Sequence, residues 1–340
     1  MIRQSIVDYG TFLQLYKWSF DQYTTIARRH TKYKFPASFL SDITYFCDVA
    51  ALDVVSVLLT AAVLTKLRIH CTHNYFLPIA LQLKTPRKLI RRIPENFWKL
   101  GFYSCTTGLS SYTVLVRHKH WFSDPLSVWS EWQPRCMIPW DVYISYVVQC
   151  GFYLHSVYAT IYLDPRRKDF AVMMTHHGIT LALITFSYAT RHFMEGAMVL
   201  FCHDINDIFL ELWKLNSNWR RRDNNKHYQL HDRAAIVSFG LFVSTWFWFR
   251  LYWYPLKVMY TAIYGPFVML DTNPKLLSGI FSFWLIFTVL LTGLLMLNIY
   301  WFALMIIGLF RHLVIRDVSE VADTRDYSVS VSFTSASDEL

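Results

Sequence analysis

The sequence predicts an all-α, polytopic membrane protein with about seven transmembrane helices that form a bundle or barrel enclosing an active site. Two observations predict this fold class. Hydrophobic residues make up 54% of the 340-residue chain, and they occur in blocks long enough (about 20 residues each) to cross a bilayer as helices. Two neighbouring blocks also carry histidine and aspartate side chains, which are costly in lipid and therefore indicate a shielded, functional interior.

The predicted spans follow from the hydropathy of the chain. Helices are expected because the backbone groups of an open strand edge would stay unpaired in lipid. Asp48 and Asp53 interrupt the first span, and the last span is longer than a bilayer requires. In chain order, the spans cover residues 48–67, 97–116, 142–163, 170–189, 196–215, 234–254 and 276–310.

Basic residues in the loops predict the topology. Lys and Arg concentrate after the first, third and fifth spans, and the loop after the third span contains the run Arg166-Arg167-Lys168. The positive-inside rule places these loops in the cytosol, which puts the N-terminus in the lumen and the C-terminus in the cytosol. Residues 1–47 are then a lumenal segment, 48–315 the membrane domain, and 316–340 a cytosolic tail whose Ser-rich, acidic composition predicts disorder.

The net charge of +9 does not indicate a nucleic-acid partner, because the basic residues lie in short loops where they set topology and meet lipid or anionic ligands. The six cysteines show no CxxC spacing and are expected to be buried thiols. Histidine boxes of the HxxxH and HxxHH kind are missing, so no metal is expected. A di-metal oxidase that uses the histidines and aspartates as ligands is an alternative.

Helical periodicity gathers polar side chains on one face of each of two neighbouring spans. On the fourth span, an arc of about 40° holds Asp169, His176, Thr180 and Ser187. His177 lies about 100° away from His176 and therefore has a different geometric role. On the fifth span, an arc of about 100° holds His203, Asp204, Asp207, Glu211 and Lys214.

The depths of these residues in the membrane also agree. At about 1.5 Å per residue, His176 lies about 10 Å from the cytosolic end of its span, Asp207 about 12 Å and Asp204 about 16 Å. His155 on the third span lies about 13 Å deep. Three helices are therefore expected to bring these residues and His203 to one level. Arg250, near the lumenal end of the sixth span, is expected to extend its guanidinium to the interface.

The chemistry of this group favours acyl transfer. A histidine beside a carboxylate is held in one tautomer and can act as a base or a nucleophile. The basic loop 166–168 suits a phosphate-bearing ligand, and the apolar, aromatic bundle suits an acyl chain. Together these features favour an acyl donor with a charged head and a long apolar chain.

Several segments resemble the Lag1 motif of ceramide synthases, which belong to the TLC-domain family. The motif segments are 166–170, His176-His177, 187–188 and 203–214, and further similar segments are 95–99, 124–132, 152–160 and 247–257. The similarity extends from about residue 50 to residue 316. Many ceramide synthases carry a homeobox-like segment between the first two spans. Residues 69–96 are too few for it, so the chain is most similar to the short type.

The resemblance implies an endoplasmic-reticulum enzyme that joins a long-chain fatty acyl group from acyl-CoA to the amine of sphinganine or sphingosine, forming (dihydro)ceramide and CoA. Acyl-CoA is then a co-substrate and no cofactor is needed, and a homodimer or a heterodimer with other ceramide synthases is implied. The short type prefers stearoyl-CoA. The loop that sets chain length in the family corresponds to residues 260–275, whose sequence departs from the familiar forms, so the acyl length stays open.

Site residues are expected in two groups. The catalytic residues are His176, His177, His203, Asp204 and Asp207, and His176 acts either as a nucleophile through an acyl-imidazole or as a general base. The substrate-binding residues are His155, Arg166, Arg167, Lys168, Thr180, Glu211 and Lys214. The alternatives to an enzyme are a seven-span receptor and a non-catalytic TLC-domain lipid sensor or translocation helper. The His-Asp-x-x-Asp group at 203–207 favours the enzyme.

Overall fold

The computed structural model describes residues 6–29, 37–87, 89–220, 227–270 and 277–314, and the regular structure in these ranges is helical throughout. The predicted all-α fold is therefore confirmed for this part of the chain. The tail at 316–340 and the end of the loop predicted at 260–275 lie outside the described residues.

The long helices correspond to the predicted spans. They are α3 (Ala51–Cys71), α5 (Arg92–Ser111), α8 (Trp140–Tyr162), α9 (Phe170–Ala189), α10 (Phe193–Trp219), α11 (Gln229–Thr245) and α13 (Leu277–Val314). The helix α9 has the bounds predicted from hydropathy. After α11 the chain continues through a π-helix, η4 (Trp246–Met259), into α12 (Tyr260–Leu270), so this rod is longer than the predicted span. The shorter elements are α1 (Tyr9–Arg29), α2 (Ala37–Phe46), η1 (Thr72–Phe76), α4 (Leu77–Gln82), η2 (Tyr112–Arg117), α6 (Lys119–Ser123), η3 (Pro125–Ser127) and α7 (Val128–Glu131).

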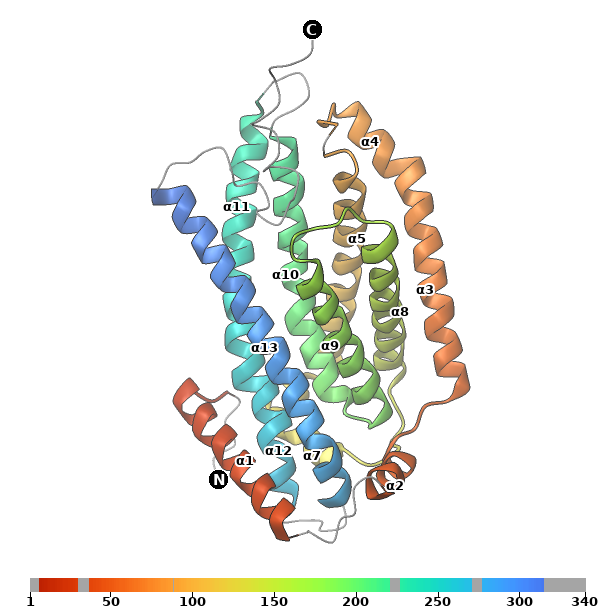
Figure 1. Ribbon diagram of the computed structural model, residues 1–340, viewed down its shortest axis with the longest axis vertical. Helices are drawn as coiled ribbons and strands as arrows, with labels where there is room; N and C mark the ends of the chain where they lie inside the picture. The colour runs from red at the N-terminus through yellow and green to blue at the C-terminus, as the bar shows by residue number, and fades with distance from the viewer. Residues whose placement is uncertain (1–5, 30–36, 88, 221–226, 271–276, 315–340) are drawn as a thin grey trace.

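The long helices stand side by side (Figure 1). We call the end where α10 leads to α11 the upper end, and the end where α9 turns into α10 the lower end, as drawn in Figure 1. Contacts between neighbouring helices form a closed circuit. It passes from α10 to α5, from α5 to α8, from α8 to α9, from α9 to α13, from α13 to η4, and from η4 back to α10. The helix α3 stands outside this circuit and packs on α8.

The outer surface of the bundle is apolar. Leu52 on α3, Ile236 on α11 and Val289 on α13 are each at least 61% exposed, as expected for side chains that face lipid. By length and composition, three stretches could cross a membrane: Phe170–Ala189, Gln229–Phe267 and Phe283–Phe310. A fourth is possible if the bent pair Leu40–Phe46 and Ala51–Gln82 forms one span. The chain is thus a multi-pass membrane protein.

Helices α5, α8 and α10 are long enough to span a bilayer, with 20, 23 and 27 residues. Their composition is less apolar because each buries polar side chains inside the bundle. Glu95 on α5, Gln149 on α8 and Asp204 on α10 are at most 2% exposed. Polar groups that face a protein interior are the arrangement expected for functional membrane helices.

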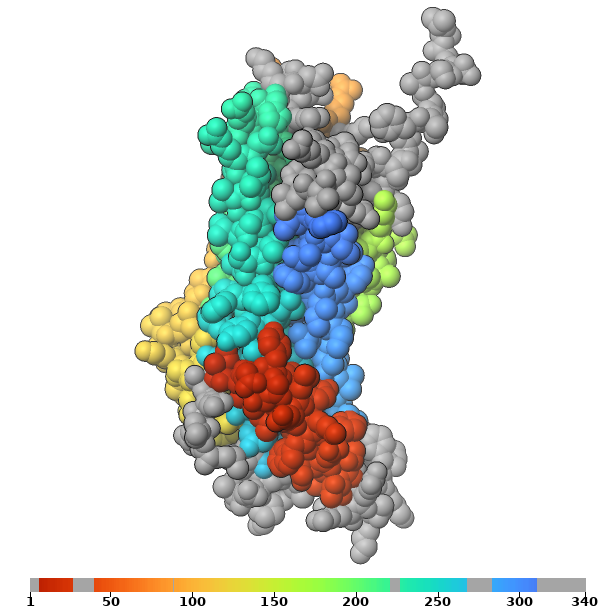
Figure 2. Space-filling view, turned by 90° about the vertical axis from the view of Figure 1, so that its left-hand side faces the viewer, coloured from red at the N-terminus to blue at the C-terminus, as the bar shows by residue number. Residues whose placement is uncertain are grey.

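Two helices, α1 and α2, lie within the predicted lumenal segment 1–47, which lies outside the predicted spans. The helix α1 lies across α12 and α13 (Figure 2). The Tyr23 ring stacks on Trp284 with 4.8 Å between ring centroids, and the hydroxyls of Tyr16 and Thr292 are 3.2 Å apart. The segment is therefore packed against the membrane domain.

The turn between α9 and α10 is tight and strained. Arg191 has a φ of 64°, a left-handed conformation that costs energy for a residue with a β carbon. Its guanidinium forms an ion pair with Asp48 and donates to the Tyr188 carbonyl over 3.2 Å. These contacts hold the turn and thereby fix the residues that open α10.

Candidate active site

An elongated cavity lies among α8, α9, α10, α12 and α13. Its lining on α13 runs from Phe283 to Leu294, which corresponds to about 16 Å of helix. Most of the lining is apolar or aromatic, and several polar side chains gather toward its two ends. Toward the upper end they are Tyr153, His176, Thr180 and His203, and toward the lower end Tyr146, Ser187, His192 and Glu195.

His176 lines the upper part of this cavity, and its Nδ1 has no hydrogen-bond partner among the described residues. Its ring lies edge-on to Trp301 at 5.2 Å and to Tyr153 at 6.4 Å between ring centroids. Thr180 Oγ1 donates to the His176 carbonyl over 2.9 Å. The imidazole is therefore held by aromatic packing and keeps a ring nitrogen available for chemistry.

His177 points elsewhere, as the predicted angular separation implies. It is 7% exposed and packs against Tyr153 with 5.9 Å between ring centroids, but it does not line the cavity. The two adjacent histidines therefore have different surroundings, and only His176 of the pair meets the cavity.

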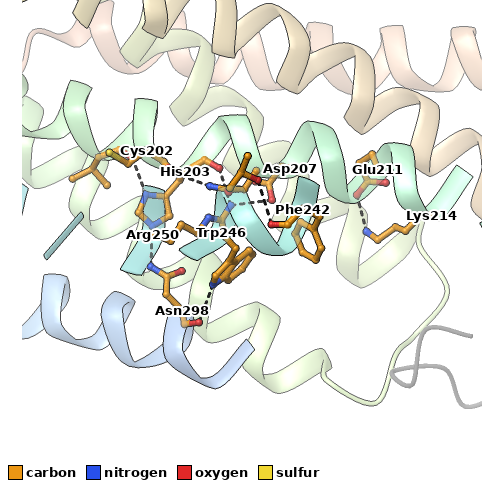
Figure 3. Close-up of polar contacts among 12 residues, drawn as sticks. Cys202, His203, Asp207, Glu211, Lys214, Phe242, Trp246, Arg250 and Asn298 are labelled. Atoms are coloured by element: carbon orange, nitrogen blue, oxygen red, sulfur yellow. Dashed lines mark hydrogen bonds and ion pairs between the residues drawn. The ribbon is translucent and has the colours of Figure 1, made fainter. Parts of the chain in front are cut away.

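His203 lines the same cavity and uses both of its ring nitrogens (Figure 3). Nδ1 is 2.7 Å from the Val199 carbonyl oxygen. Because a carbonyl can only accept, Nδ1 carries the proton. Nε2 of the neutral ring then accepts from Asn298 Nδ2 over 3.1 Å. These contacts fix the tautomer and the orientation of the ring.

Asp207, whose side chain is 16% exposed, forms an ion pair with the buried Arg250 (Figure 3). Arg250 donates from one terminal nitrogen to Asp207 Oδ1 over 3.0 Å and to the His203 carbonyl over 2.8 Å, and its guanidinium lies 4.0 Å from the Trp246 ring centroid. The predicted position of Arg250 at the interface is wrong, because the side chain is 4% exposed. It belongs to η4, whose wider π-helical turn departs from the 3.6-residue period assumed in the prediction.

Asp204 is fully buried and accepts a hydrogen bond at Oδ2 from Gln149 Nε2. Neither Asp204 nor Asp207 is part of the cavity lining. The structure thus brings His176 and His203 to one cavity and places the two aspartates behind them. Asp207 reaches the cavity wall through Arg250 and the His203 backbone.

A second polar cluster lies toward the upper end, on α5, α10 and the loop before α9. Arg167 donates to both oxygens of Glu95 over 2.9 and 3.0 Å, and Lys99 Nζ donates to Glu95 Oε1 over 2.6 Å. Lys214 Nζ donates to Glu211 Oε1 over 2.6 Å. Three of the predicted substrate-binding residues, Arg167, Glu211 and Lys214, are therefore engaged in ion pairs within the protein.

The remaining predicted binding residues are dispersed. His155 does not line the cavity; its Nδ1 lies 2.9 Å from Thr65 Oγ1, and its ring packs edge-on to Trp98 at 5.8 Å between centroids. Equal depth brought His155 to the level of the other histidines, but its face of α8 turns toward α3 and α5. Arg166 and Lys168 are exposed, and Arg166 stacks over Phe170 at 4.6 Å.

Glu95 anchors the upper cluster, which yields a stability prediction. Replacing Glu95 with alanine leaves Lys99 and Arg167 without their shared carboxylate, and we expect the free energy of unfolding to fall by about 1–3 kcal/mol. Glu95→Gln keeps a hydrogen-bond acceptor and should lose less. Thermal unfolding of the purified protein in detergent measures both effects. Equal melting temperatures for Glu95→Ala and the wild type would contradict this role.

Within the described residues, the His, Cys, Asp and Glu side chains form no group of three that could hold a metal ion. The reason lies in their hydrogen bonds. His203 uses both nitrogens, Asp204 faces Gln149, and Asp207 faces Arg250. These contacts compete with metal coordination.

Comparison with known proteins identifies the family. The profile of the TLC domain matches residues 92–307, which contain the cavity's histidines. Ceramide synthase 1 of Homo sapiens is 38% identical over 266 residues, covering 78% of this chain and 73% of the human protein. Ceramide synthase 1 of Mus musculus is 37% identical, covering 82% and 77%. Ceramide synthase LOH2 of Arabidopsis thaliana is 32% identical, covering 69% and 75%. The chain therefore belongs to the TLC-domain family, and its resemblance to the ceramide synthases is shown along most of its length.

Proposed function

We propose that this protein is a ceramide synthase, an N-acyltransferase that moves a fatty acyl group from acyl-CoA to the amine of a sphingoid base. The observation that carries the proposal is the cavity itself, in which His176 meets a long apolar lining. An imidazole at one end of an apolar slot can act on a thioester carbonyl while the acyl chain lies along the slot. The names of the similar proteins support this reading.

The reaction forms a C–N amide bond and breaks the C–S thioester bond. As a general base, His176 takes a proton from the attacking amine and returns one to the CoA sulfur as it leaves. As a nucleophile, it first forms an acyl-imidazole and releases CoA, and the amine then attacks that intermediate. His203 forms the part of the cavity wall on α10, and Arg250 and Asp207 hold it from behind. In this proposal His177 and Asp204 support the geometry and the proton balance of the site.

The proposed orientation places the upper end in the cytosol of an endoplasmic-reticulum membrane, with the N-terminus lumenal and the C-terminus cytosolic. Seven helices span the membrane in this proposal. Six of them enclose the cavity, as the closed circuit of contacts through α5, α8, α9, α13, η4 and α10 supports, and α3 packs outside on α8. The exposed Arg166 and Lys168 lie in the loop before α9 at the cytosolic entrance, where they suit the phosphates of CoA. No cofactor takes part, stearoyl-CoA is the proposed donor, and a homodimer or heterodimer is the proposed assembly.

The test is an acyl-transfer assay with the purified full chain, sphinganine and a series of acyl-CoAs of increasing length. We expect (dihydro)ceramide and free CoA in equal amounts, with one chain length preferred. Absence of amide with every acyl-CoA, in protein that remains folded, would favour the alternative of a TLC-domain lipid sensor or translocation helper. Metal analysis of the same preparation tests the metal-oxidase alternative.

A further inference from the structure

The lower end of the cavity holds a carboxyl group that the proposed reaction does not use. Glu195, in the first turn of α10, lines the cavity and is 7% exposed. Its Oε1 is buried and has no hydrogen-bond partner among the residues that the structure describes. Because a buried polar group without a partner is costly, such a group in a cavity wall indicates a ligand that supplies the missing hydrogen.

Other side-chain donors that line this cavity are already hydrogen-bonded within the protein. Trp129 Nε1 donates to the Thr261 carbonyl over 2.9 Å, and Trp284 Nε1 donates to the Ile263 carbonyl over 2.9 Å. The Tyr146 hydroxyl lies 3.0 Å from Ser187 Oγ and 3.3 Å from the Phe193 carbonyl oxygen. These donors therefore already form hydrogen bonds within the protein.

The glycine that follows shapes the same wall. A β carbon at Gly196 would overlap the Tyr146 hydroxyl and lie 3.0 Å from Ser187 Oγ, so glycine is required for this polar contact beside Glu195. His192, which also lines the cavity, has its Nδ1 2.9 Å from Thr190 Oγ1. The lower end is thus a built polar pocket at the end of an apolar slot.

A bent acyl chain can reach from one end of the cavity to the other. His176 and Ser187, which both line the cavity, are eleven residues apart on α9, about 16 Å along the helix, and Ser187 Oγ lies beside Gly196. If the thioester carbonyl lies at His176, the chain runs down the apolar lining and its far end meets Glu195. A terminal methyl group there would leave the carboxyl without a partner, whereas a terminal hydroxyl can donate to it.

We propose that the lower end of the cavity binds a hydroxyl group on the terminal carbon of the acyl chain, with Glu195 as its hydrogen-bond acceptor. This inference rests on the proposed acyl-transfer function and narrows its substrate class: the protein uses ω-hydroxyacyl thioesters in preference to methyl-ended thioesters of the same length, so 18-hydroxystearoyl-CoA should be a better donor than stearoyl-CoA. Glu195 is then a specificity-determining residue, because a site built to bond a hydroxyl discriminates against the analogue that lacks it.

The experiment compares matched pairs of donors with the purified full chain and sphinganine. The pairs are stearoyl-CoA with 18-hydroxystearoyl-CoA, and palmitoyl-CoA with 16-hydroxypalmitoyl-CoA. The readout is the ratio of kcat/KM for the hydroxylated donor to that for the methyl-ended donor. We expect a ratio of at least about 10 for the wild type in the better-used pair.

Three variants sharpen the test. Glu195→Val removes the acceptor and should bring the ratio to or below unity, mainly by improving use of the methyl-ended donor. Glu195→Gln keeps a carbonyl acceptor and should give an intermediate ratio. Ile184→Val changes the apolar lining without touching a polar group and should affect both donors of a pair alike.

The outcomes distinguish a failure of this inference from a failure of the proposed acyl-transfer function. An equal ratio in the wild type and Glu195→Val would overturn the inference, even if the variant accepted longer chains, because Glu195 would then only limit length. Failure of the folded wild type to acylate sphinganine with any of the four donors would overturn the proposed function and the inference together. A ratio that falls in Glu195→Val but not in Ile184→Val supports it.

Discussion

Replacing His176 with alanine is expected to lower the rate of amide formation by about 100- to 10,000-fold, the range that a positioned acid–base group contributes. The physical reason is local. The His176 ring meets the cavity and retains a nitrogen without a hydrogen-bond partner, whereas both nitrogens of His203 are engaged. The measurement is kcat with stearoyl-CoA and sphinganine, normalised to the amount of folded protein.

The adjacent histidine is the matched control. His177 is buried beside the same tyrosine but does not line the cavity, so His177→Ala should reduce activity less than His176→Ala does. Both variants remove one imidazole from adjacent positions of α9, which makes their effects on stability comparable. Equal activity of His176→Ala and the wild type would exclude His176 from the reaction.

Acylation of His176 distinguishes the two proposed chemical routes, nucleophilic catalysis and general-base catalysis. Intact-mass measurement after incubation with acyl-CoA in the absence of the amine should show an added acyl group if His176 is a nucleophile. The adduct should disappear in His176→Ala. If no adduct forms while the complete reaction proceeds, His176 acts as a general base.

Much of this architecture follows from hydropathy and helical period alone. The apolar block at 170–189 became α9 with the same bounds, because both of its ends are set by polar loop residues. The 100° rotation per residue separated His176 from His177, and the structure gives them different surroundings. The convergence of His176 and His203 on one cavity was likewise predictable, since each lies on the polar face of its helix.

The partners of the polar residues could not be predicted in the same way. A helical wheel shows which side chains share a face, but it does not show which distant helix supplies the opposing group. Gln149, Arg250 and Asn298 are paired with the motif residues through contacts between helices. One signal was present in the sequence, because an arginine inside an apolar span is costly and calls for a buried partner.

Glu195 shows a second limit of prediction from the sequence, which concerns the ends of helices. The hydropathy pattern starts the fifth span at Gly196, which leaves Glu195 one residue outside the predicted membrane helix. The structure begins α10 at Phe193 and so brings this carboxyl inside the bundle. Helix ends depend on local turn geometry, here the strained Arg191, and this geometry is not visible in an average over a long window.

The ion pair between Asp207 and Arg250 leads to the largest expected change in stability. Asp207→Ala leaves the Arg250 guanidinium 4% exposed and without its carboxylate. Removing one partner of a buried pair is expected to lower the free energy of unfolding by about 3–5 kcal/mol. Arg250 also holds the His203 carbonyl, so activity should fall together with stability. Denaturant or thermal unfolding in detergent, followed alongside the acyl-transfer assay, measures both.

Two further variants separate the structural part of this effect from the chemical part. Asp207→Asn keeps an oxygen that can accept from Arg250, so it should retain more stability than Asp207→Ala. The double variant Asp207→Leu/Arg250→Met removes both charges and should be more stable than Asp207→Ala, because no unpaired charge remains in the interior. If the double variant recovers stability but not acyl transfer, the pair positions His203 for the reaction. If Asp207→Ala unfolds at the same denaturant concentration as the wild type, Arg250 finds another partner, and the ion pair does not hold this wall of the cavity.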